Sequence, residues 1–152
     1  MTASREIENL IYIYAERIDS GDLEGVAELF RYGEIVSTTY NTCHAGYDEV
    51  LSLYEQACRI YPDSGTPKTR HLTSNVIIEI NDSGTAARTR SCFTVLQATE
   101  TLPLQPIISG RYHDSFTLGT TGWQFARREM FIDLMGDCSA HLLYTLGAAQ
   151  GD

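Results

Sequence analysis

Basic residues and long apolar runs are scarce in this sequence, and each shortage argues against a class of function. The chain carries 11 Lys and Arg against 20 Asp and Glu, for a net charge of −9. A surface this acidic repels phosphate backbones and anionic lipid headgroups, so we expect no nucleic-acid partner and no membrane partner. No apolar run approaches the ~18 residues of a membrane span, and the first residues lack the pattern of a signal peptide. A cytoplasmic location is therefore the default expectation.

Cysteine pairs and the common catalytic motifs are also missing. The four cysteines, Cys43, Cys58, Cys92 and Cys138, form no C-x-x-C pair and fit no zinc module, so we expect reduced, partly buried thiols. The sequence contains no G-x-S-x-G, no glycine-rich phosphate loop, no H-E-x-x-H and no G-x-G-x-x-G after a strand. Hydrolase triads, nucleotide sites and metal sites gain no support. Acid–base chemistry without a cofactor remains open.

What is present is a single domain of 152 residues whose first half has helical spacing. One apolar stripe predicts a helix that breaks at Ser20-Gly21, and Asp22 is a plausible N-cap for a short second helix. A third helix is expected over residues 46–61, stopped by Pro62. The stripe of the first helix consists of Ile7, Leu10, Ile11, Tyr14 and Ile18.

The rest of the chain has strand periodicity. A β-rich piece covers residues 34–40, and longer strands are predicted over 70–80, 85–98, 106–118 and 123–135, with "GTTG" as the hairpin loop between the last two. Residues 138–146 read as a short helix, and residues 147–152 as a disordered tail. Helices followed by a meander of long strands define an α+β domain. Because twist accumulates along such strands, we expect a cone-shaped α+β barrel: a strongly curled antiparallel sheet wrapped over three N-terminal helices, with a ligand cavity at its open end.

Two polar residues far apart in the sequence are candidates for acid–base chemistry. His71 opens the strand over residues 70–80, where Thr73 and Asn75 share its face. Asp19 ends the first helix. A carboxylate at that end interacts unfavourably with the helix dipole, by roughly 0.3–1 kcal/mol, which is a hint that Asp19 is retained for another reason. Helical periodicity alone does not turn Asp19 inward. A structural histidine and a solvated helix-end carboxylate therefore remain alternatives, as does a packed core ring for Tyr14.

The order of these motifs resembles a known superfamily. A helix ending in Y-x-x-x-x-D-x-x-D, then "AELF", "RHLTSN" with "VIIEI", and "GRYHDSF" before "GW-F-RR" are similar to the SnoaL-like group of the nuclear-transport-factor-2-like fold. Within that group the pattern is most similar to dehydratase-type members: scytalone dehydratase, bile-acid 7α-dehydratase and hexachlorocyclohexane dehydrochlorinase. The resemblance implies a catalytic pair of Asp19 and His71 assisted by Tyr14. Two departures from scytalone dehydratase, no histidine in residues 85–98 and Ile18 in place of a tyrosine, argue against scytalone as substrate.

The resemblance further implies a cofactor-independent lyase acting on a small hydrophobic molecule, polycyclic or steroid- or polyketide-like. Apolar walls would come from Phe30, Phe93, Tyr112 and Phe131, although core packing explains the same residues. A homodimer or homotrimer is implied as well. An isomerase or cyclase with Asp19 as base, and a binding or oligomerisation domain without chemistry, remain open. One of Arg127 and Arg128 could meet a substrate anion, but a surface or interface ion pair is the preferred interpretation.

Overall fold

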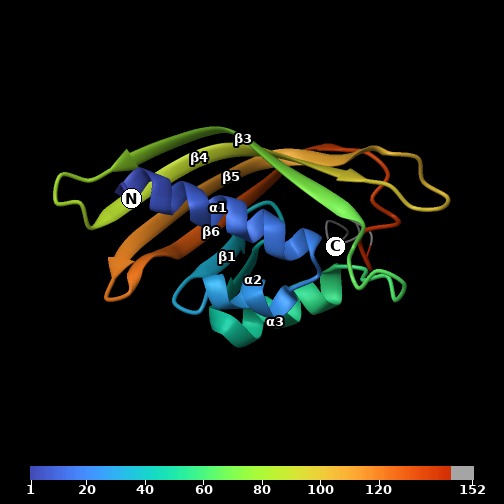
Figure 1. Ribbon diagram of the computed structural model, residues 1–152, viewed down its shortest axis with the longest axis horizontal. Helices are drawn as coiled ribbons and strands as arrows, with labels where there is room; N and C mark the ends of the chain where they lie inside the picture. Colours follow the sequence, from blue (N-terminus) through green and yellow to red (C-terminus); the bar gives the residue numbers. More distant parts are fainter. Residues whose placement is uncertain (145–152) are drawn as a thin grey trace.

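The computed structural model describes residues 1–144, which form three helices and one six-stranded sheet (Figure 1). The helices are α1 (Ala3–Asp19), α2 (Leu23–Leu29) and α3 (Gly46–Ala57). The strands are β1 (Glu34–Ser37), β2 (Thr42–Ala45), β3 (Thr69–Ile80), β4 (Ala86–Gln97), β5 (Gln105–Gly119) and β6 (Gly122–Met135). The predicted α+β class is confirmed. The tail expected to be disordered, residues 147–152, lies outside the described residues.

The sheet has the order β2-β1-β6-β5-β4-β3 and remains open, with β2 and β3 as its edges. The four long strands form the predicted antiparallel meander, but β1 runs parallel to β6, so the sheet is mixed. The strand β2 was not predicted; it forms a short antiparallel pair with β1. An antiparallel hairpin needs only a short turn, whereas the parallel contact of β1 joins segments about ninety residues apart that no local pattern connects.

The helices begin and end where their caps allow. Thr2 caps α1, and Asp22 caps α2 by accepting a hydrogen bond from the Gly25 backbone N–H at 2.8 Å, as predicted. The helix α3 ends at Ala57, earlier than expected, because Cys58 is extended and forms an isolated bridge with Leu142. The helix expected over residues 138–146 is wrong for its described part: residues 138–144 form turns and that bridge.

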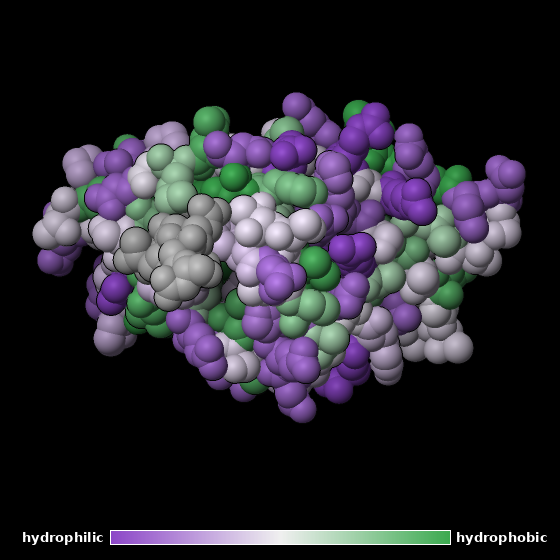
Figure 2. Space-filling view, turned by 180° about the vertical axis from the view of Figure 1, so that it is seen from behind, coloured by the Kyte–Doolittle hydropathy of each residue, from purple (hydrophilic) through white to green (hydrophobic). Residues whose placement is uncertain are grey.

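The core lies between the helices and the meander of long strands. The predicted stripe of α1 faces it: Ile7, Ile11, Tyr14 and Ile18 are at most 3% exposed. In Figure 1, α1 crosses the sheet, and α2 and α3 lie together beside it. On the opposite side of the molecule, Figure 2 shows hydrophilic residues interspersed with small hydrophobic groups. None of the described helices has the length and apolar character needed to cross a bilayer.

A bulge in β3 changes which residues face the core. The pairing of β3 with β4 shifts between Ser74 and Ile77, and Asn75 has a positive φ of 55°. Asn75 is consequently exposed instead of sharing the face of His71, while Val76 packs against the core. Before the bulge, the predicted alternation holds.

Candidate active site

Asp19 and His71 are hydrogen-bonded to each other. The last residue of α1 meets the third residue of β3, with 2.6 Å between His71 Nδ1 and Asp19 Oδ1. Asp19 accepts two more hydrogen bonds, from the His71 backbone N–H at 2.8 Å and the Thr69 hydroxyl at 2.9 Å. The side chains of His71 and Asp19 are only 8% and 13% exposed. The end of α1, rather than helical periodicity, turns Asp19 inward.

These hydrogen bonds determine the charge of the carboxyl group. Burial raises the pKa of Asp19, but the hydrogen bond and charge of the His71 ring, with the hydrogen bonds from the His71 backbone and Thr69, outweigh it and lower that pKa. An ionised Asp19 accepts the proton on Nδ1 of His71. In the neutral ring Nε2 then carries the free lone pair, which is the form that can act as a base.

His71 lies on the wall of a mostly apolar, partly open cavity of about 140 Å³ lined by α1, α3, the sheet and the C-terminal segment. The lining side chains that carry hydroxyl groups or ring nitrogens are Tyr14, Tyr54, His71, Tyr112, His141 and Tyr144. A separate open groove of about 600 Å³ between α1 and β3 reaches Asp19 and His71 from outside. The pair therefore stands between the cavity and the surface.

Tyr14 lies in the core, as its position on the stripe predicted, and also on this wall. Its hydroxyl is 2.5 Å from that of Tyr54 on α3. Burial raises the pKa of both phenols well above the ordinary value, so both remain protonated at neutral pH. Only one of the two protons can lie between the two oxygens, so the other can be donated to a neighbouring acceptor, either the Tyr112 hydroxyl or a group in the cavity.

A buried ion pair supports the rings behind the cavity. Arg128 on β6 donates two hydrogen bonds to Asp114 on β5, at 2.9 and 2.8 Å, and both side chains are fully buried. The guanidinium lies 3.7 Å from the centroid of the Tyr112 ring and 4.2 Å from that of Tyr14. The surface ion pair that the sequence favoured is therefore wrong for Arg128. It holds for Arg127, which is half exposed beside Glu34.

His141 is a cavity residue that the sequence did not reveal. Its ring is 6% exposed, and its centroid is 6.4 Å from that of His71. Burial, followed by the charge of His71, lowers the pKa of His141 to about 4, so the ring is neutral at physiological pH. A histidine in a segment without regular structure has no periodicity to mark it.

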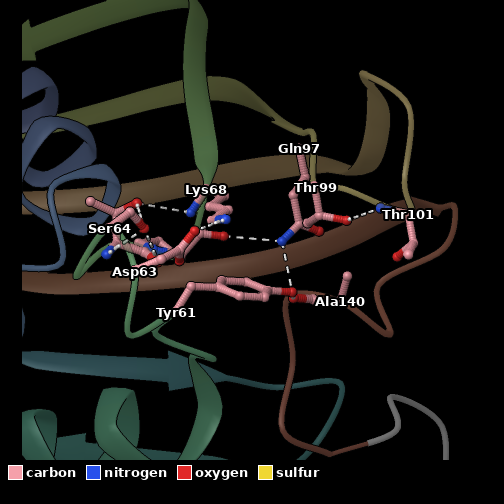
Figure 3. A network of polar contacts seen from close by, with 10 residues as sticks. Tyr61, Asp63, Ser64, Lys68, Gln97, Thr99, Thr101 and Ala140 are labelled. Carbon is pink, nitrogen blue, oxygen red and sulfur yellow. Dashed lines mark hydrogen bonds and ion pairs between the residues drawn. The ribbon is translucent and has the colours of Figure 1, made fainter.

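The segment that carries His141 is held by two hydrogen bonds to the backbone carbonyl group of Ala140, the residue before it. Figure 3 shows the Tyr61 hydroxyl and the Gln97 amide converging on Ala140, at 2.6 and 3.0 Å. Gln97 is 1% exposed and also donates to the carbonyl of Pro67. His141 is thus held rigidly although it follows the last strand.

The aromatic residues proposed as cavity walls fall into two groups. Phe93 and Tyr112 line the cavity and stack at 4.4 Å. Phe30 instead lies in the core, stacked on Phe125 at 4.7 Å, and it is not among the lining residues. Phe131 lies on the other face of β6, beside Arg111 and His113.

The cysteines of the chain are neither paired nor grouped with other metal-ligating side chains within residues 1–144. All four cysteines are free thiols; Cys43 is exposed, and Cys58 is buried on the cavity wall. Burial raises the pKa of Cys58 to about 12, so it is an unreactive thiol at neutral pH. Within residues 1–144, no group of three or more His, Cys, Asp or Glu side chains could hold a metal ion.

This arrangement of helices, sheet and cavity defines an NTF2-like, cystatin-like α+β fold. Residues 1–129 match the model of the SnoaL-like domain, and the chain belongs to that family. A search of curated proteins found no match.

Several solved structures share the fold. An NTF2-like protein from Novosphingobium aromaticivorans is 22% identical with a TM-score of 0.72, covering 91% of this chain and 86% of its own. A protein named "putative scytalone dehydratase" from the same organism is 26% identical, with a TM-score of 0.70 and coverages of 88% and 86%. ActVI-ORFA from Streptomyces coelicolor is 16% identical, with a TM-score of 0.69 and coverages of 86% and 96%.

Proposed function

We propose that this protein is a cofactor-independent lyase that eliminates water from a small hydrophobic substrate. The observation that carries the proposal is the hydrogen bond between Asp19 and His71, whose ring lines a mostly apolar cavity. The 26% identical structure named "putative scytalone dehydratase" supports the same reaction class.

The reaction needs one base that can also act as an acid. His71 Nε2 removes a proton from carbon, the electron pair of that C–H bond forms the C=C bond, and the C–O bond breaks. The His71 imidazolium returns the proton to the departing oxygen, which leaves as water, so the ring is restored and no other reactant is consumed. Asp19 stabilises the imidazolium and fixes its tautomer, as the carboxylate of a catalytic triad does. Positioned proton transfer contributes about 10²–10⁴-fold.

The tyrosine pair complements this base. When the proton leaves a carbon beside a carbonyl group, negative charge develops on the carbonyl oxygen, and the available proton of the Tyr14–Tyr54 pair can stabilise it. The same feature would serve an isomerase, which is the second candidate. In that reaction Asp19 would itself be the base, but both of its oxygens already accept hydrogen bonds from Thr69 and His71. The lyase is therefore the better supported of the two.

Single substitutions separate the candidates. After a thermal-shift screen of hydroxylated steroids, polyketide-type aromatics and aromatic alcohols, turnover of the hits is measured for H71A and D19N. The exposed His113 supplies the matched control H113A. A lyase loses about 10²–10⁴-fold in H71A and less in D19N, while H113A retains full turnover. If H71A retains turnover while D19N abolishes it, the isomerase is correct. If neither variant differs from H113A, the pair is structural.

A further inference from the structure

His141 lies next to His71 in the same cavity. The two rings lie 6.4 Å apart, centroid to centroid, and are inclined by 73°. Both line the same cavity, but His71 belongs to β3 and His141 to the segment after β6. A group held between them would contact both rings.

The His141 ring has hydrogen-bonding capacity that the described chain does not use. Among residues 1–144, its buried Nδ1 has no hydrogen-bond partner. Leaving a buried polar atom unpaired costs free energy, which a bound ligand could recover. The anchor of Ala140 on Tyr61 and Gln97 prevents this segment from moving freely toward solvent (Figure 3).

We propose that His141 binds the hydroxyl group that departs in the reaction, and that the substrate is therefore a neutral, apolar alcohol. The assignment of that hydroxyl as the leaving group rests on the proposed lyase activity; hydroxyl binding by His141 does not. Because His141 is neutral, it adds no second positive charge when His71 becomes an imidazolium. It binds the oxygen and takes no proton, so the proton balance of the elimination is unchanged.

The volume of the cavity limits the size of the substrate group that it can hold. Its volume of about 140 Å³ is close to that of an apolar protein cavity, about 150 Å³, that accommodates benzene. The stacked rings of Phe93 and Tyr112 on the wall suit a flat ring. The volume and the stacked rings together fit one flat ring bearing a hydroxyl group.

The test compares phenol with benzene, two probes that differ only in the hydroxyl group. Dissociation constants are measured by NMR titration for wild type, H141F and H141Q, with ¹⁵N-labelled histidine reporting on the ring nitrogens. We expect wild type to bind phenol more tightly than benzene. The ratio of the two dissociation constants should fall about tenfold in H141F, whereas H141Q, which retains a hydrogen-bonding group, should keep most of it. Phenol should also shift the ¹⁵N signals of His141 in the wild-type protein, which tests the contact without any substitution.

Further variants separate this inference from the proposed function. D19N should keep the phenol preference even if it abolishes turnover, because it leaves both histidine rings in place. If H141F retains the preference and Y54F loses it, the tyrosine pair binds the hydroxyl and the inference is wrong. The inference also fails if wild type does not distinguish the probes, or if phenol leaves the His141 signals unchanged. Turnover that survives H71A would instead contradict the lyase and leave the hydroxyl site standing.

Discussion

Individual residues of the site depend on their hydrogen-bond partners for their charge. Asp19 is held as a carboxylate by three donors. His141 is held neutral because burial and the charge of His71 lower its pKa by more than the charge of Asp19 raises it. The two groups shift in the same direction for different reasons: donors stabilise the charged form of an acid, and burial destabilises the charged form of a base. Each group should therefore change the free energy of unfolding over its own range of pH.

For Asp19, the stabilising contribution is present above the ordinary carboxyl pKa and disappears as pH falls through the lowered value. D19N should lose about 1–3 kcal/mol at pH 7, because an amide group cannot accept all three hydrogen bonds. The difference from wild type should shrink below about pH 4. Urea denaturation across this range checks it, with D82N in an exposed turn as the control. A difference that persists undiminished at pH 2 would show that charge is not the cause.

For His141, the sign follows from its lowered pKa of about 4. Between that value and about 6.5 the unfolded chain binds a proton that the folded chain does not, so the free energy of unfolding falls as pH decreases. The loss in wild type should reach about 3 kcal/mol, and H141Q should lack it. Parallel urea titrations of wild type, H141Q and H113Q check this. Equal slopes in wild type and H141Q would exclude His141 as the group responsible.

At the scale of elements, the turn after α1 positions Asp19. The Asp22 N–H donates to the Arg17 carbonyl and the Gly21 N–H to that of Ile18, a pattern that ends a helix with a left-handed residue. Gly21 is that residue, with a φ of 79°, and a Cβ there would collide with the carbonyl oxygen of Gly65. The loop before β3 thus packs against the end of α1. This contact brings Asp19 to the first residues of β3.

Two glycine substitutions separate the energetic cost of a left-handed backbone from the cost of crowding by a new methyl group. Gly84 also has a positive φ, 68°, but faces open space. G84A should cost about 1–2 kcal/mol for the left-handed backbone alone. G21A should cost about 1–3 kcal/mol beyond that, because the new methyl group meets backbone. Urea denaturation of both variants measures the difference; equal losses would mean that the loop of Gly65 moves aside at no cost.

The elements also show why part of the structure could be predicted and part could not. The stripe of α1 and the N-cap at Asp22 follow local rules, and the structure confirms both. The bulge at Asn75 and the parallel contact of β1 with β6 depend on segments distant in the sequence. The periodicity of a single segment cannot reveal such contacts. His141 lay in a segment expected to be helical. Asp19 reaches His71 only because α1 ends where it does.

At the scale of the whole molecule, the fully buried pair of Arg128 and Asp114 joins the sheet to the aromatic core. It connects β5 to β6 and places a cation against the rings of Tyr14 and Tyr112. Within residues 1–144, the Nη1 atom of Arg128 is buried without a hydrogen-bond partner, so the pair is not fully satisfied. Its energetic role must therefore lie in mutual compensation of two charges rather than in the number of hydrogen bonds.

That compensation makes removal of one partner costly and removal of both tolerable. R128M or D114L alone should destabilise the protein by about 3–5 kcal/mol, because each leaves an uncompensated charge in the core, whereas R128M combined with D114L should regain most of the loss. A double-mutant cycle by urea denaturation measures the coupling.

Arg111 and Asp133 form the same two-bonded geometry, at 2.8 and 3.0 Å, on the exposed face of the sheet. R111M should therefore cost far less than R128M, since water screens that pair. Similar losses in the two variants would show that packing of the long side chain, and not burial of its charge, gives Arg128 its importance.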